Sequence, residues 1–185
     1  TLASVTSPSV SASISPDSLN LGQSLQTSFT YNSFGQLLTT TDQAGVVTRF
    51  TYGTAGHEKG YLHSTRHGDQ TASPLITTFG YNSVGRLITT TDPRGYTFTS
   101  YVNQLDQTLR AETPPVTDHG NVVYFSTAAF DLNGNMESSG ISNFDENGNP
   151  QTPAQITTTF AYNLLDMVTS ITEPISIGLS RPTTF

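Results

Sequence analysis

Hydrophobic and polar residues alternate in short runs along most of the chain, and turn-forming residues separate these runs. The run at residues 75–81 has the period of two that is typical of a half-buried strand. Its alternate positions hold Leu75, Thr77, Phe79 and Tyr81. Residues 86–91 are rich in β-branched side chains and favour a second strand. The pattern predicts an all-β protein made of tandem antiparallel β-hairpins, with almost no helix.

One stretch of the chain occurs twice, because residues 29–45 and 79–95 are identical at eleven of seventeen aligned positions. Shorter related segments begin at residues 130, 144 and 160. Internal repeats of this kind indicate a repeated structural unit. We predict that the structural repeat residues are Phe29, Tyr31, Gly35, Leu37, Asp42, Gly45, Phe79, Tyr81, Gly85, Leu87, Asp92, Gly95, Phe130, Gly134, Phe144, Gly148, Phe160 and Tyr162.

Each main copy contains two four-residue turns. An Asn side chain can bond its own backbone, and Gly accepts the positive φ that most residues avoid. In the second copy Asp92, Pro93 and Gly95 stand where a β-turn favours these residue types. The sequence therefore predicts tight turns at residues 32–35, 42–45, 82–85 and 92–95.

The segment from Tyr81 to Gly95 reads Tyr-x-x-x-Gly-Arg-Leu-x-x-x-x-Asp-Pro-x-Gly. This pattern resembles the YD repeat of the rearrangement-hotspot (RHS) proteins, which include toxin-complex shell proteins and the teneurins. The segments that begin at Phe130 and Phe144 resemble a variant with Phe in place of Tyr. The resemblance covers about residues 25–172. It implies that the hairpins form a curled sheet or a β-solenoid-like segment of a shell.

The chain departs from the repeat pattern at a few positions. Asn32 and Asn82 replace the Asp that follows Tyr, and Asp166 stands where the weaker third copy, which begins at Phe160, needs Gly. Tyr101 is followed by Leu105 where the pattern has Gly. These departures leave the boundaries of the individual repeats open.

Composition shifts divide the chain into five segments. Residues 1–24 form a Ser/Thr-rich extended lead-in, either a loose terminus or an edge or donor strand for a neighbouring sheet. Residues 25–111 are the first YD-repeat block, and residues 112–120 are a Pro-rich breaker. Residues 121–172 are the second, degenerate block, and residues 173–185 are a tail. We expect the whole to be a mature protein or a piece of a longer one.

Composition narrows the choice of partners. Charged residues are only 11% of the chain, whereas it holds 31 Thr and 21 Ser, which suit strands with hydroxyl-bearing faces. Without Cys, no disulfide framework or thiolate metal site can form. The net charge of −7 and the single Lys59 argue against nucleic acid and anionic membranes as partners. No apolar run approaches the ~20 residues of a membrane span.

Two groups of residues raise the question of a metal site. His57, His63 and His67 lie close together in the sequence. On a strand, His63 and His67 would share one face about 13 Å apart by the strand rise, which is too far for both to bind one metal ion. Residues 131–135 and 145–149 begin like a calcium loop but lack its later Gly and Glu, and Asn-Gly favours a hairpin turn. We interpret both runs as turns and predict no metal and no cofactor.

No catalytic motif is present, so we predict that the chain is not an enzyme. The first hypothesis is a structural, extracellular YD-repeat protein that encloses or displays a partner and assembles through open sheet edges. Its partners would be other YD repeats of a parent chain or identical copies. The alternatives are a cell-surface adhesin or carbohydrate-binding module, with glycans as ligands, and a self-polymerising extracellular filament subunit.

Overall fold

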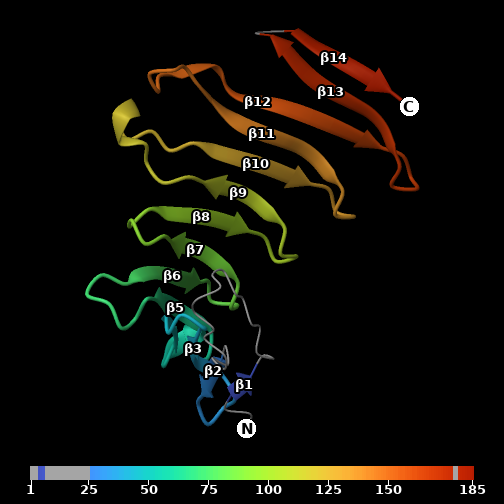
Figure 1. Cartoon of the computed structure of the whole chain (residues 1–185). Helices are drawn as coiled ribbons and strands as arrows, with labels where there is room; N and C mark the ends of the chain where they lie inside the picture. Colours follow the sequence, from blue (N-terminus) through green and yellow to red (C-terminus); the bar gives the residue numbers. More distant parts are fainter. Residues whose placement is uncertain (1–3, 7–25, 177–178) are drawn as a thin grey trace, which may run out of the picture. The chain divides into compact units, whose positions relative to one another are not determined.

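The computed structural model describes residues 4–6, 26–176 and 179–185, and it confirms the predicted all-β architecture. The chain divides into two compact units, Thr1–Gly85 and Arg86–Phe185 (Figure 1). Helical structure in the described residues is limited to two short 3-10 helices, η1 (Gly56–Glu58) and η2 (Thr117–His119). None of the described helices is long and apolar enough to cross a membrane.

The first unit is an antiparallel sheet in which each strand pairs with the next strand along the chain. Its strands are β1 (Ser4–Thr6), β2 (Gln26–Tyr31), β3 (Leu37–Thr41), β4 (Val47–Tyr52), β5 (Leu62–His67) and β6 (Leu75–Tyr81). Of the predicted lead-in, only residues 4–6 are described, and they pair with β2. The rest of residues 1–24 lies outside the described residues.

The second unit is built in the same way, with neighbouring strands paired in chain order. Its strands are β7 (Leu87–Thr91), β8 (Thr97–Val102), β9 (Thr108–Glu112), β10 (Phe125–Phe130), β11 (Met136–Phe144), β12 (Pro150–Tyr162), β13 (Val168–Ser176) and β14 (Leu179–Thr184). β9 and β10 pair across the predicted breaker, and residues of the predicted tail contribute to β13 and β14. The five-segment division itself stays a prediction.

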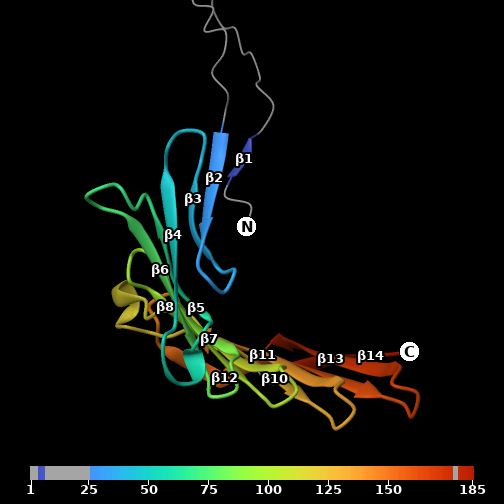
Figure 2. The ribbon, with the colours of Figure 1, turned by 90° about the horizontal axis from the view of Figure 1, so that it is seen from below.

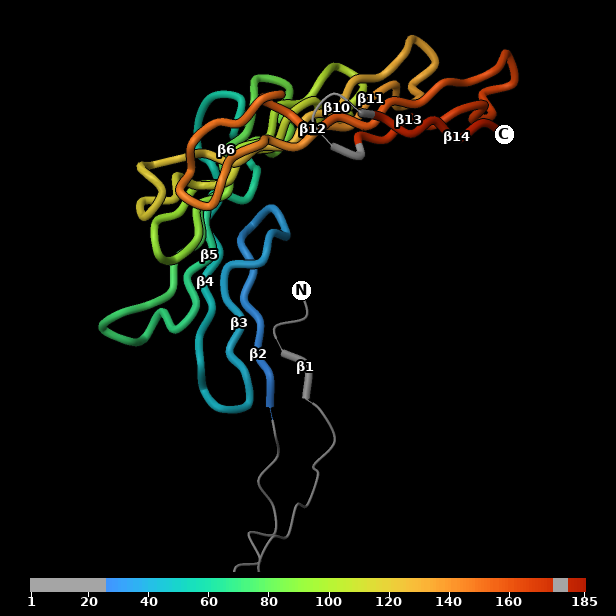
Figure 3. Tube along the Cα trace, turned by 90° about the horizontal axis from the view of Figure 1, so that it is seen from above, coloured from blue at the N-terminus to red at the C-terminus, as the bar shows by residue number. Residues whose placement is uncertain are grey.

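The sheet of the second unit is a single layer, as its edge-on views show (Figure 2; Figure 3). Among the described residues of both units, no large hydrophobic side chain is buried. Backbone pairing and contacts across the strands therefore hold the sheet together, because it has no second layer against which to form a core.

The strand register separates two chemically different faces in the second unit. Cross-strand pairs place Ala111, Ser126, Ile141 and Ile156 in one row, and the pair Phe160–Ile171 lies on the same face. The opposite face is mostly hydroxyl-bearing, with the rows Thr127–Gly140–Thr157 and Ser138–Thr159–Thr172. This alternation is the expected result of a period of two along each strand.

Candidate functional site: the repeated hairpin turn

One turn geometry recurs at eight hairpin ends of the described chain. The backbone N–H of the fourth residue donates to the carbonyl oxygen of the first over 2.9–3.2 Å, and the fourth residue has positive φ. This is a type I turn closed by a left-handed residue, a common hairpin connection. It occurs at residues 32–35, 42–45, 82–85, 92–95, 103–106, 131–134, 145–148 and 163–166. The four turns predicted from sequence are confirmed.

The first residue of each turn is Asn or Asp, because its side chain closes the turn from inside. The Oδ1 atom of Asn32 accepts the backbone N–H groups of Phe34 and Gln36 over 3.0 and 2.9 Å. Asp131 accepts those of Asn133 and Asn135 over 2.9 and 2.8 Å in the same way. The interpretation of residues 131–135 and 145–149 as turns is therefore confirmed.

Two of the eight turns place Asp, instead of Gly, at the left-handed fourth position. Asp106 and Asp166 have φ of 68° and 58°, a region that Asp tolerates better than most residues do. The position of Asp106 also corrects the alignment of this repeat. Its turn starts at Asn103, so Val102 and not Tyr101 holds the place of the repeat tyrosine.

The residue after the left-handed position connects neighbouring turns along one edge of each unit. The Nε2 atom of Gln36 donates to the carbonyl oxygen of Gly60 over 2.8 Å, and Gln107 reaches Gly134 over 3.2 Å. The guanidinium of Arg86 bonds the turn at 103–106 through the carbonyl oxygens of Asn103 and Gln104 and the carboxylate of Asp106, the last over 3.1 Å.

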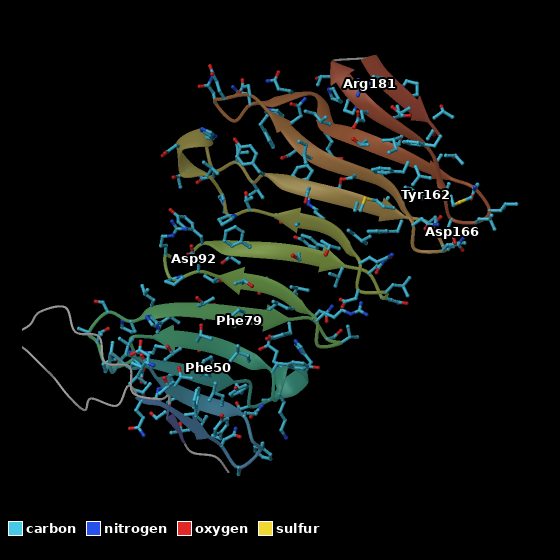
Figure 4. The ribbon with its side chains drawn as sticks, turned by 45° about the vertical axis from the view of Figure 1, so that its right-hand side comes forward. Phe50, Phe79, Asp92, Tyr162, Asp166 and Arg181 are labelled. Carbon is cyan, nitrogen blue, oxygen red and sulfur yellow. The ribbon has the colours of Figure 1, made fainter. Side chains whose placement is uncertain are left out.

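The turns at 131–134 and 163–166 are joined by a small amide–carboxylate cluster. The Nδ2 atoms of Asn133 and Asn135 both donate to Oδ1 of Asp166, over 3.0 and 2.8 Å. Figure 4 shows Asp166 close to Tyr162, at the end of the β12–β13 hairpin. The Asp that replaces Gly thus links its own turn to the neighbouring one.

A register shift accompanies the end of most outgoing strands. In the β2–β3 pair, Thr30 faces Thr39 but Tyr31 faces Leu37, so one residue of the return strand is left out of the ladder. The same shift occurs at Tyr52, Val102, Phe130 and Tyr162. Such a β-bulge increases the local twist and bends the strand.

Three tyrosines at strand ends hydrogen-bond to the strand that precedes their own. The hydroxyl groups of Tyr52, Tyr81 and Tyr162 donate to the carbonyl oxygens at the start of the preceding strand, over 2.9, 2.8 and 2.9 Å. The acceptors are Leu37, Leu62 and Met136. Tyr52 is not among the repeat residues predicted from sequence, although its position at the end of an alternating run matches that of Tyr31.

The repeat tyrosines Tyr31, Tyr81 and Tyr162 form no aromatic ladder among the ring contacts of the described residues. Tyr81 stacks instead on Tyr61, from the loop after β4, with ring centroids 4.9 Å apart. The reason is geometric, because Tyr31 and Tyr81 lie four strands apart and each strand step is about 4.8 Å. Equivalent rings therefore cannot touch.

Local hydrogen bonds lower the pKa of several carboxyl groups. The hydrogen bond from the Asn149 side chain has the largest effect on Asp145 and lowers its pKa, and the bond from the Asn149 backbone N–H lowers it further. At Asp92 and Asp131 burial acts in the opposite direction, but hydrogen bonds within the turn outweigh it and lower the pKa. The bond from Arg49 lowers the pKa of Asp69, and burial raises the pKa of Tyr81.

His57, His63 and His67 make different closest polar contacts, although His57 also lies 4.0 Å from Glu58, the neighbour of His63. His57 Nε2 lies 3.0 Å from the carbonyl oxygen of Tyr81, and His67 Nδ1 lies 2.9 Å from Thr48 Oγ1. His63 Nδ1 is 3.9 Å from Glu58. The described residues contain no group of three His, Cys, Asp or Glu that could hold a metal ion.

Comparison with known proteins supports the repeat assignment. Residues 31–68 match the sequence model of the RHS repeat, which confirms the resemblance to that family. No curated protein matches the chain. The Photorhabdus luminescens Tc holotoxin pore has a similar fold, with a TM-score of 0.61, 19% identity and 80% of this chain covered. A TcdB2–TccC3 crystal structure matches with a TM-score of 0.61 and 20% identity, again over 80% of this chain.

The chain spans about 7% of the length of these two solved chains. The likeness shows a shared fold of consecutive hairpins.

Proposed function

We propose that the chain is a structural segment of a β-shell, in which the sheet serves as a wall one layer thick. The observation that carries this proposal is a sheet of repeated hairpins whose described large hydrophobic side chains are all at least partly exposed. A sheet of this kind gains stability from more strands or a covered face. The RHS-repeat match and the fold shared with the Tc chains support the same function.

The sheet edges would be the assembly surfaces. β14 pairs with β13 on one side, and no described strand pairs with its other side. An unpaired edge offers backbone N–H and C=O groups to another strand. We propose that the neighbouring strands come from further YD repeats of a parent chain or from identical copies.

The wall would enclose or display a partner, and its role would be structural instead of catalytic. The mixed faces of the second unit support this role, since one carries apolar rows and the other hydroxyl groups. We also propose an extracellular site of action, on the basis of the fold shared with Tc toxin chains.

The edge proposal is tested by light scattering on the purified full chain over a range of concentrations. We expect a mass that rises with concentration, because open edges pair. Lys substitutions at two exposed positions of β14, Ser180→Lys and Thr183→Lys, should suppress this rise, since charged edges resist pairing.

The matched control adds the same charge away from the edge, with Ser33→Lys and Ser83→Lys in exposed turn positions. It should associate like the unmodified chain. A full chain that stays monomeric at high concentration would contradict edge assembly, and a self-sufficient binding module would then be the better interpretation.

A further inference from the structure

Three hairpin turns of the second unit present leucine side chains to solvent. The turns follow β8, β10 and β12 and lie at the right-hand end of these strands in Figure 1. They are the turns at 103–106, 131–134 and 163–166. Leu132 and Leu164 are fully exposed, and Leu105 and Leu165 are 69% and 76% exposed. We call these four side chains the leucine tips.

The turns at the opposite end of the strands are different. The middle of the turn at 92–95 holds Pro93 and Arg94, and the middle of the turn at 145–148 holds Glu146 and Asn147. Apolar side chains scattered singly over a surface need no explanation, but a row of them at one end indicates an interaction surface.

The leucine tips are presented by closed turns. The backbone N–H of Leu105 donates to Oδ1 of Asn103 over 2.9 Å, and that of Leu165 donates to Oδ1 of Asn163 over 2.9 Å. The backbone of each turn is thus held from inside, while the side chains of its second and third residues lie outside. Leu132 and Leu164 are exposed completely and add nothing to the packing of the chain itself.

The polar groups beside the leucine tips carry a surplus of negative charge. Arg86 pairs with Asp106 over 3.1 Å. Asp131 and Asp166 are hydrogen-bonded by backbone and amide N–H groups, which leave their negative charge in place. The same end of an identical copy, or an anionic lipid surface, would therefore be repelled.

We propose that the leucine tips dock on a zwitterionic lipid surface that exposes phosphatidylcholine headgroups. The leucine side chains would enter the boundary between headgroups and acyl chains, as the apolar side chains of interfacial proteins do. The trimethylammonium groups of the lipid would lie against Asp131 and Asp166, so the charges of the two surfaces are complementary.

The spacing of the tips favours lipid over a protein partner. Successive hairpins are two strands apart, which separates neighbouring tips by about 10 Å. A protein partner would need a separate pocket for each tip at this spacing, whereas a fluid lipid boundary accepts each side chain where it enters. The docking surface consists of these turns alone, so it does not rest on the shell function.

Co-sedimentation of the full chain with phosphatidylcholine vesicles tests this proposal. We expect the bound fraction to rise with the lipid concentration. The double variant Leu132→Gln, Leu164→Gln should weaken binding by about tenfold or more, because two apolar side chains no longer enter the lipid. Both positions are fully exposed, so the fold should be unchanged, which circular dichroism can check. Phosphatidylserine mixed into the vesicles should lower the bound fraction, because its charge repels Asp131 and Asp166.

The matched control is Leu75→Gln, which removes an exposed leucine from the start of β6 instead of from a turn, and it should bind like the unmodified chain. The proposal is overturned if phosphatidylcholine vesicles do not bind the chain, or if they bind the double variant equally well. Binding only to vesicles that contain phosphatidylserine would also overturn it. A double variant that changes the mass of the lipid-free chain in light scattering, with vesicle binding unchanged, would assign the tips to a protein contact instead.

Discussion

At the scale of single residues, the left-handed position of the turn imposes different demands in different turns. A Cβ atom added at Gly35, where φ is 81°, would meet no atom within 4 Å. At Gly85, with the same φ, a Cβ atom would overlap the hydroxyl group of Tyr61. Gly35 is therefore required by its backbone conformation alone, whereas Gly85 must also leave room for a ring.

This difference predicts unequal costs for the same substitution. Gly35→Ala should lower the free energy of unfolding by about 1 kcal/mol, the cost of a left-handed Ala. Gly85→Ala should cost about 2–4 kcal/mol, because Tyr61 must also leave its stack on Tyr81. Urea unfolding of the two variants measures both losses in free energy. Equal losses would show that the contact between Gly85 and Tyr61 does not affect stability.

The tyrosine hydroxyl groups give a second prediction at this scale. Tyr52→Phe should lower the free energy of unfolding by about 1 kcal/mol, because the Leu37 carbonyl loses its donor. Tyr31→Phe is the control, since no described group bonds that hydroxyl, and it should be nearly neutral. If the two substitutions have the same effect in urea unfolding, the hydroxyl bond does not stabilise the hairpins.

At the scale of the element, sequence reasoning worked where the structure is local. Asn or Asp followed by Gly three positions later predicted the turns, because both residues act within four positions. The roles of Gln36 and Gln107 in bonding a neighbouring loop or turn were not predicted from sequence, since their partners lie 24 and 27 positions away. The sequence signal that could have predicted these bonds is the polar side chain directly after the left-handed residue of the turn. The groove of about 420 Å³ beside residues 112–120 could not be foreseen, because this segment meets β8 only in the folded unit.

The turn carboxylates predict acid sensitivity. Hydrogen bonds lower the folded-state pKa of Asp145 below its unfolded value of about 3.9. Its contribution to stability is therefore present above that pH and is lost as the pH falls through the folded-state pKa. Asp145→Asn should make the free energy of unfolding depend less on pH between about 4 and 2.

The substitution is conservative, because Asn occupies the same position in the turn at 32–35. Glu146→Gln, next to it, removes a carboxylate that makes no described hydrogen bond and should leave the pH dependence unchanged. Urea unfolding at several pH values compares the two. A pH profile of Asp145→Asn that coincides with that of the unmodified chain would refute the role of this carboxylate.

At the scale of the whole molecule, the absence of buried large hydrophobic side chains among the described residues predicts an unusual calorimetric signature. Unfolding of ordinary globular proteins raises the heat capacity by about 12–15 cal/mol/K per residue, mainly through exposure of apolar surface. Here the described large hydrophobic side chains are already partly exposed. Scanning calorimetry of the dilute chain should therefore give a clearly smaller value per residue. A value within the ordinary range would mean that apolar surface is covered in solution.

The recurring bulge has a consequence for how such a protein can change its length in evolution. The bulge recurs at the same place in several hairpins, and a bulge of this kind bends its strand. Duplication or loss of one complete hairpin pair would thus shift the downstream strands by a whole period and leave their pairing intact. The near-identical stretches at residues 29–45 and 79–95 offer matching ends for unequal recombination. Within a unit, the bending that the bulges contribute would therefore change by whole repeats.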